Sequence, residues 1–269
     1  MSFSTWTPAA LSSDARTFAG TCWRLVEAQY IVSTLKLVDS VTEHELLEDL
    51  IEATKPPVPP DCRGLHYLLS TPFRYGALYP IGSRFRRAGM TDGVFYASES
   101  PETAVAEMAF YRLLFFADSP DTPWPSNPAE YTAFSAEFAT RKAIELTKGK
   151  YGAERAKWMH TNDYSHCQTF ADAARAAKIE VIGYASVRDL QHRMNFALLA
   201  CRAFARPKPT HQQTWHIRLS ETGAQAICEA PKCGITFDRK SFAADPRIAK
   251  LRWVRALRTQ PALSAQGRK

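Results

Sequence analysis

The sequence lacks the features that would place it in a membrane or a fibre. None of its 269 residues belongs to an apolar run approaching the roughly 18–20 residues that cross a bilayer. It also has no internal repeat and no low-complexity tract. Hydrophobic residues make up 45% and charged residues 23%, as in soluble globular proteins. We therefore expect one large globular domain, or one domain with extensions, and no association with a membrane.

Cysteine is sparse, and its spacing is not that of a metal site. The chain has six cysteines and no CxxC pair. Cys228 and Cys233 lie near each other with His216 upstream, but there is no second ligand pair for zinc. We expect no bound metal and mostly reduced thiols that fill the core. Residues 1–6 have neither the basic nor the apolar region of a secretory signal, so the expected location is the cytoplasm.

The common nucleotide-binding and hydrolase motifs are absent too. No GxxxxGK[ST] occurs, and no GxGxxG follows a predicted strand. Ser186 lacks a GxSxG elbow, which disfavours a hydrolase-type nucleophile. A nucleotide, if bound, must be held by another arrangement.

Positive charge is unevenly distributed along the chain. The net charge of +7 comes from 34 Lys and Arg against 27 Asp and Glu. Residues 201–269 hold 14 basic and 4 acidic residues, whereas residues 1–200 hold 20 and 23. Because the excess is confined to one end, it favours a local phosphate or acidic partner, or none, over direct nucleic-acid binding.

Helices and strands alternate in the predicted secondary structure. Three proline-rich stretches mark loops: residues 55–60, 119–125 and 206–209. Helices are predicted after Thr42, which has capping-box spacing to Glu45, from Ser100 to about 116, and from about 163 to 178. Short strands are predicted at 73–75, 94–97, 179–184, 196–199, 215–219, 224–228 and 234–237. The intervals between strands are too short for repeated βαβ crossovers, which favours an α+β fold.

Four positions are candidates for chemistry. Glu107 is a lone carboxylate in an apolar stretch, where it either faces water or is desolvated. Arg84 lies in a basic, glycine-flanked loop suited to phosphate, or simply solvated. Tyr96 ends a strand and either stacks on a ligand or fills the core. Ser186 follows a strand and suits a hydroxyl that orients a ligand or caps a turn.

Taken in order, these residues resemble the RES-domain family, which is named for its arginine, glutamate and serine. The resemblance covers about residues 70–205 and is carried by five short segments: Arg74-Tyr75, GSRF at 82–85, GVFYAS at 93–98, AVAE at 104–107 and YASVRD at 184–189. It implies a fold similar to ADP-ribosyltransferases, with a mixed or antiparallel sheet core and flanking helices. It also implies a toxin of a toxin–antitoxin pair that acts on NAD as a substrate and needs no resident cofactor.

The resemblance also implies a role for each residue. Glu107 would be the catalytic carboxylate, and Arg84 and Arg74 would hold the pyrophosphate or ribose of NAD. Tyr75 and Tyr96 would line the nicotinamide pocket. Ser186 would orient the nicotinamide ribose or amide.

The implied activity is cleavage of the nicotinamide–ribose bond with water or phosphate as acceptor, as in NAD glycohydrolases and phosphorylases. A carboxylate suits this reaction because the ribose becomes oxocarbenium-like. The implied partner is a helix-turn-helix antitoxin; a homo-oligomer is left open. Two alternatives remain: mono-ADP-ribosyl transfer to a protein, and a non-catalytic binding module that uses the basic C-terminal region. The expected organisation is a helical N-terminal extension (1–69), a catalytic domain (70–240) and a basic tail (241–269).

Overall fold

The computed structural model describes residues 6–28, 34, 37–74, 82–89 and 92–255. Its α-helices are α1 (Pro8–Asp14), α2 (Val41–Thr54), α3 (Tyr67–Arg74), α4 (Pro101–Asp118), α5 (Gly149–Ala153), α6 (Arg155–Trp158), α7 (Ser165–Ala176) and α8 (Pro246–Ala249). Its strands are β1 (Arg16–Glu27), β2 (Phe95–Ser98), β3 (Ala129–Glu145), β4 (Val181–Ala185), β5 (Met194–Leu198), β6 (Gln212–Ser220), β7 (Gly223–Cys228) and β8 (Cys233–Asp238). The short 3₁₀ turns η2 (Pro60–Cys62) and η3 (Cys201–Ala203) lie among the described residues.

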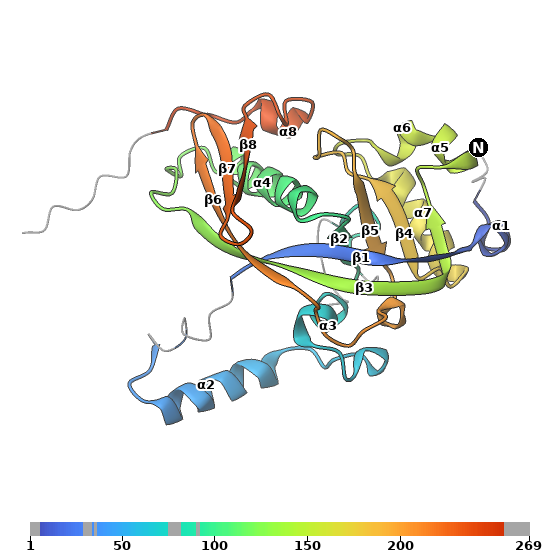
Figure 1. The fold of residues 1–269 in the computed structure, drawn as a ribbon, viewed down its shortest axis with the longest axis horizontal. Helices are drawn as coiled ribbons and strands as arrows, with labels where there is room; N and C mark the ends of the chain where they lie inside the picture. Colours follow the sequence, from blue (N-terminus) through green and yellow to red (C-terminus); the bar gives the residue numbers. More distant parts are fainter. Residues whose placement is uncertain (1–5, 29–33, 35–36, 75–81, 90–91, 256–269) are drawn as a thin grey trace, which may run out of the picture.

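The strands form one mixed sheet in the order β1-β2-β5-β4-β3-β6-β7-β8 (Figure 1). The β3–β4 pair is parallel and the other pairs are antiparallel. β1 pairs with β3 along most of its length and with β2 at Trp23↔Ser98. The pairings among β1, β2, β5, β4 and β3 thus close into a ring, while β6, β7 and β8 extend from β3 as an antiparallel meander. This arrangement confirms the α+β class.

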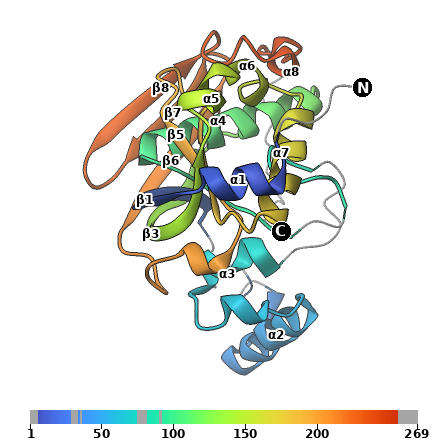
Figure 2. The same ribbon diagram turned by 90° about the vertical axis from the view of Figure 1, so that its right-hand side faces the viewer.

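Helices lie against the sheet in separate places (Figure 2). Their buried side chains form three apolar clusters with the strands. α4 packs its buried face, including Val105 and Phe110, against β6, β7 and β8. α7 packs through Phe170 on the side that carries Tyr184 of β4. The third cluster joins α3 to β2 and β5 through residues such as Phe73 and Phe95. α4 therefore covers the β6–β8 end of the sheet, and α7 covers the region of β4.

Several local expectations are confirmed. Ser100 caps α4 by accepting from the backbone N–H of Thr103 at 3.3 Å, and Pro101 occupies the first turn. The predicted helix near 163–178 is α7. The predicted strands at 94–97, 179–184 and 196–199 correspond to β2, β4 and β5, and the three C-terminal strands to β6, β7 and β8.

Other expectations are wrong. Residues 73 and 74 belong to helix α3, because Leu69 and Phe73 are buried together at helical spacing; Tyr75 lies outside the described residues. The capping box of α2 is Ser40 with Glu43, two residues before the predicted one.

The expected division into extension, domain and tail also differs from the structure at both ends. The N-terminal region is not purely helical, since β1 is a full member of the sheet. At the other end, Phe242, Ile248 and Leu251 are buried in the α4 cluster, so 241–251 is packed chain and not a free tail. The domain boundaries themselves remain a prediction.

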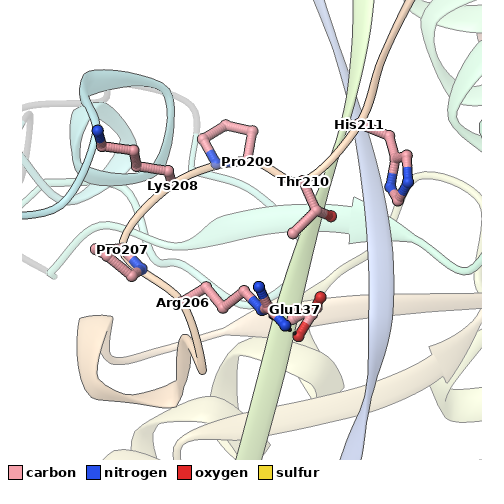
Figure 3. A pocket seen from close by; sticks show the side chains of 7 residues that line it. All are labelled: Glu137, Arg206, Pro207, Lys208, Pro209, Thr210 and His211. Atoms are coloured by element: carbon pink, nitrogen blue, oxygen red, sulfur yellow. Dashed lines mark hydrogen bonds and ion pairs between the residues drawn. The ribbon is translucent and has the colours of Figure 1, made fainter.

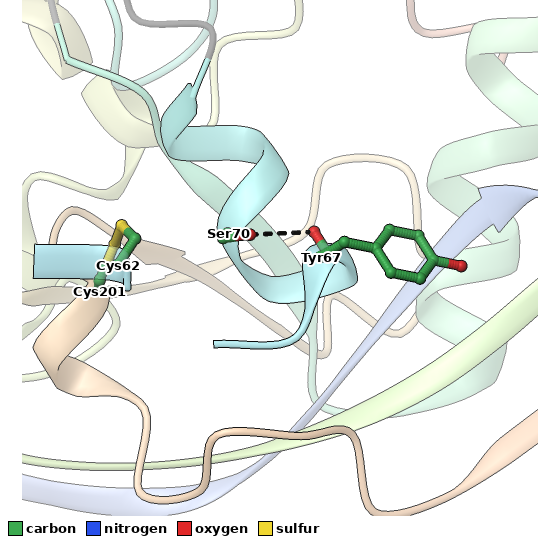
Figure 4. The surroundings of a disulfide bond; sticks show 4 residues. All are labelled: Cys62, Tyr67, Ser70 and Cys201. Carbon is green, nitrogen blue, oxygen red and sulfur yellow. Dashed lines mark hydrogen bonds between the residues drawn. A yellow bond between two sulfur atoms is a disulfide. The ribbon is translucent and has the colours of Figure 1, made fainter. Parts of the chain in front are cut away.

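The expectation of mostly reduced, core-filling thiols holds for most of the cysteines and fails for one pair. Cys62 of η2 and Cys201 of η3 form a disulfide beside α3, with their Cα atoms 5.4 Å apart (Figure 4). Cys22, Cys167 and Cys228 are buried free thiols, as expected of core residues, whereas Cys233 is exposed. Within the described ranges, no helix is both long enough and apolar enough to span a membrane.

Candidate active site

The carboxylate of Glu107 is held from one side only. Glu107 lies in the first half of α4, and its Oε1 accepts hydrogen bonds from Ser186 Oγ at 2.7 Å and from Asn195 Nδ2 at 2.6 Å. Within the described part of the chain, Oε2 accepts no hydrogen bond from protein. The side chain is partly exposed. One oxygen is therefore fixed in position and the other is available to a ligand.

Ser186 is fully buried and committed to its neighbours. Its Oγ accepts from the backbone N–H groups of Arg188 at 3.1 Å and Asp189 at 3.0 Å, so its proton points to Glu107. Both polar capacities of the hydroxyl are thus used. This disfavours a nucleophilic role, and the predicted contact of Ser186 with the ribose or amide of nicotinamide remains a prediction.

Asn195 belongs to the site although the sequence analysis did not select it. It lies on β5 in register with Ser98 of β2 and Tyr184 of β4. Its Oδ1 accepts from Ser98 Oγ at 2.7 Å, which turns its amide group toward Glu107. The sequence pointed to Asn195 only indirectly. Segments 93–98 and 184–189 both carry motifs of the resemblance, and β5, which contains Asn195, pairs with the strands of both segments.

Arg84 is buried, and its charge is compensated by carbonyl groups. Nη1 donates to Trp158 O at 2.5 Å and Nη2 to His160 O at 3.1 Å. The guanidinium lies 4.6 Å from the Tyr164 ring centroid. No described carboxylate forms an ion pair with it. A buried cation held only by dipoles leaves a positive potential in its surroundings.

Glu107 and Arg84 both lie close enough to the buried Tyr184 to affect its pKa. Burial raises the pKa of Tyr184 well above its usual range, the nearby Glu107 charge raises it further, and Arg84 opposes both. Tyr111 retains half of its exposed surface, yet its desolvating surroundings and then Tyr164 and Glu107 raise its pKa. Arg84, Glu107 and Ser186 are thus brought to one region.

Tyr96 holds the turn that carries Arg84. Its hydroxyl is hydrogen-bonded to Ser83 Oγ at 2.8 Å and accepts from the backbone N–H of Phe85 at 2.9 Å. Burial raises the pKa of this phenol. Whether its ring also lines a nicotinamide pocket remains a prediction.

Arg74 is not brought to this region. It donates to Glu52 Oε1 at 2.5 Å and to the carbonyl of Pro56, both near α2. None of its described contacts involves Arg84, Glu107 or Ser186. The predicted companion Tyr75 lies outside the described residues.

A cavity elsewhere in the protein contains none of the predicted residues. It measures about 640 Å³ and is lined by the segment 206–211 beside Glu137 of β3 (Figure 3). Its lining is Glu137, Arg206, Pro207, Lys208, Pro209, Thr210 and His211. Arg206 is already paired with Glu137 at 2.9 Å. Across the described ranges, no cluster of three or more His, Cys, Asp or Glu residues could hold a metal ion.

Comparison with known proteins adds a family match. A family model described as RES domain matches residues 58–220. Among solved structures, the chain is similar to one in the crystal structure of the M. tuberculosis MbcT–MbcA toxin–antitoxin complex, at 11% identity and a TM-score of 0.45. That alignment covers 78% of this chain and 92% of the other. No curated protein matches the sequence.

Proposed function

Because the chain belongs to the RES-domain family, we propose that it is a toxin that consumes NAD by cleaving the nicotinamide–ribose bond. The observation that carries the proposal is the Glu107 carboxylate, which Ser186 and Asn195 hold through one oxygen while no described residue donates to the other. Such a group is suited to stabilise positive charge that develops on a bound sugar. Fold alone does not establish an activity, so we infer the activity from the residues of this site.

In the proposed reaction the bond between ribose C1 and the nicotinamide nitrogen breaks, and its electron pair leaves with neutral nicotinamide. Positive charge develops on the ribose, next to the free oxygen of Glu107. A water molecule or phosphate ion then forms the new bond to C1. With water, loss of its proton yields ADP-ribose.

Each residue has a separate task. Ser186 and Asn195 fix the orientation of the Glu107 carboxylate before substrate arrives, so no reorganisation is needed at the moment of cleavage. Arg84 supplies positive potential toward the diphosphate while remaining anchored to carbonyls. The substrate would thus be oriented between an anionic and a cationic group.

The proposal includes an ADP-ribosyltransferase-like fold, a cytoplasmic location and a helix-turn-helix antitoxin as partner. The mixed sheet with flanking helices is compatible with that fold. A small helix-turn-helix protein encoded beside this chain, whose co-expression relieves growth arrest, would support the partner.

The test is to incubate the purified protein with NAD, with and without phosphate, and to measure free nicotinamide. Glu107→Gln should lower its release about 100- to 1,000-fold, because it removes the charge and keeps the shape. Glu102→Gln is the control, because Glu102 is a carboxylate on the same helix. Its ion pair with Arg193 is long, at 3.9 Å, so its loss should have little effect. Equal release by wild type and Glu107→Gln would refute the proposal. Labelled NAD that marks a discrete protein band in a lysate would favour ADP-ribosyl transfer instead.

A further inference from the structure

A buried ion pair joins the Ser186 loop to the C-terminal segment. Arg188 Nη1 lies 2.9 Å from Asp245 Oδ2, and the two side chains are 3% and 0% exposed. Asp245 also caps α8 by accepting from the backbone N–H of Arg247 at 2.9 Å. It lies beyond residues 58–220, the part that matches the family. The family motifs therefore depend here on a carboxylate outside them.

The Arg188 guanidinium connects further parts of the site. Its Nη2 donates to Thr161 O at 2.6 Å, next to His160, whose carbonyl holds Arg84. Its Cζ lies 3.6 Å from the ring centroid of Phe110, one helical turn after Glu107 on α4. One buried cation thus touches the segment that anchors Arg84 and the helix that carries Glu107.

Asp245 lies between two guanidinium groups, those of Arg188 and Arg247, and offsets their mutual repulsion. Arg247 Nη2 donates to Asp245 Oδ2 at 2.8 Å and to Thr161 O at 3.1 Å, and its guanidinium lies 5.4 Å from the same Phe110 ring. Without the carboxylate, two like charges would face each other with little solvent to screen them. The loop that carries Arg188 would then move.

That movement would reach the carboxylate of Glu107. The backbone N–H groups of Arg188 and Asp189 donate to Ser186 Oγ, and this hydroxyl donates to Glu107 Oε1. We propose that Asp245 is a positioning residue that acts through Arg188 to keep Ser186 aligned on Glu107. Its catalytic consequence rests on the function proposed above.

The first experiment compares Asp245→Asn and Arg188→Lys with wild type and with Glu180→Gln. Glu180 is the matched control, a buried carboxylate bonded to Thr140 and Arg202 and without a described contact to the site. Asp245→Asn should lower kcat for nicotinamide release about 100-fold with little change in KM, while Glu180→Gln leaves both unchanged. Arg188→Lys keeps the positive charge but removes the planar guanidinium that reaches both Asp245 and Thr161, so it should lower kcat as well. This variant provides the test if Asp245→Asn does not fold.

The second experiment separates positioning from general stability. In a Ser186→Ala background, Asp245→Asn should cause no further loss of kcat, since both changes break the same chain of contacts. If the fold-loss of kcat in the double variant equals the product of the two single losses, the proposal is overturned. It is also overturned if Asp245→Asn lowers kcat no more than Glu180→Gln does.

A third measurement does not depend on activity. Hydrogen exchange of the Arg188 and Asp189 amides should become faster in Asp245→Asn and stay unchanged in Glu180→Gln. Unchanged exchange in Asp245→Asn would overturn the proposal. If the wild type releases no nicotinamide but the exchange behaves as expected, the proposed function fails and the positioning of Ser186 stands.

Discussion

Two donors share one oxygen of the Glu107 carboxylate, and Asn195 supplies the shorter contact, at 2.6 Å. A hydrogen bond to a charged group contributes about 1.5–3 kcal/mol. Asn195→Ala should therefore lower nicotinamide release about 10- to 150-fold, because Glu107 keeps its charge but loses part of its orientation. Asn162→Ala, an exposed position outside the site, is the control for steady-state kinetics. An Asn195→Ala enzyme with wild-type kcat would show that Ser186 alone orients the carboxylate.

Tyr96 has an effect on stability that is separate from any contact with substrate. Its hydroxyl is the partner of the Phe85 N–H and of Ser83 Oγ. Tyr96→Phe leaves that buried N–H without its acceptor, so the free energy of unfolding should fall by about 1–3 kcal/mol. Urea denaturation measures this, with Tyr67→Phe at a 54% exposed position as the comparison. Equal losses in both variants would contradict the role assigned to Tyr96.

At the level of single residues, the sequence predicted Glu107, Arg84 and Ser186 as members of one site, and the structure brings them together. It could not predict what holds them. Arg84 is anchored by the carbonyls of Trp158 and His160, and every residue type carries a carbonyl, so composition contains no signal for them. Arg74 was predicted at this site but pairs with Glu52. Nothing in the sequence distinguishes Glu52 from the other carboxylates of its segment as the partner of Arg74.

Among the longer helices α2, α4 and α7, α2 buries the fewest side chains. His44 is its only described buried residue, and Leu46 and Leu50 are 59% and 56% exposed. A helix of 14 residues has little stability without packing. Hydrogen–deuterium exchange should therefore be faster in α2 than in α4, whose buried face includes Phe110 and Leu113. Protection of α2 equal to that of α4 would mean that the helix is covered in solution.

Helices with a clear start were predictable from the sequence, and long strands were not. α4 begins at a serine followed by proline, a local signal that needs no tertiary context. β3 is buried on both faces over much of its length, so its sequence does not alternate between polar and apolar residues. The aromatic segment at 73–75 suggested a strand, but burial of Leu69 and Phe73 on one face makes residues 67–74 a helix.

For the whole molecule, buried aspartates predict how stability depends on pH. Burial alone would raise the pKa of Asp245, but Arg247 and Arg188 outweigh it and hold the pKa below its usual 3.8. Asp189 is lowered in the same way, burial being outweighed by Arg193 and Thr103. The unfolded chain therefore binds protons at a higher pH than the folded chain. This contribution to stability is complete above about pH 5 and is lost as the pH falls through 4 and below.

Urea denaturation at several pH values between about 6 and 3 tests this expectation. The free energy of unfolding of wild type should decrease toward acid, and the decrease should be shallower in Asp245→Asn, which has one such group fewer. An identical slope in the two proteins would show that Asp245 is not responsible.

The Cys62–Cys201 disulfide constrains the chain on the largest scale, since 139 residues separate its ends. Closing so long a loop removes much of the conformational freedom of the unfolded chain, and losing a native disulfide typically costs about 2–5 kcal/mol. Cys201→Ala should lower the free energy of unfolding by about that amount. A reductant should do the same to wild type and nothing further to Cys201→Ala. Cys233→Ala, which removes an exposed free thiol, is the control. Equal unfolding curves for wild type with and without reductant would show that packing of η2 against η3 holds this region without the bond.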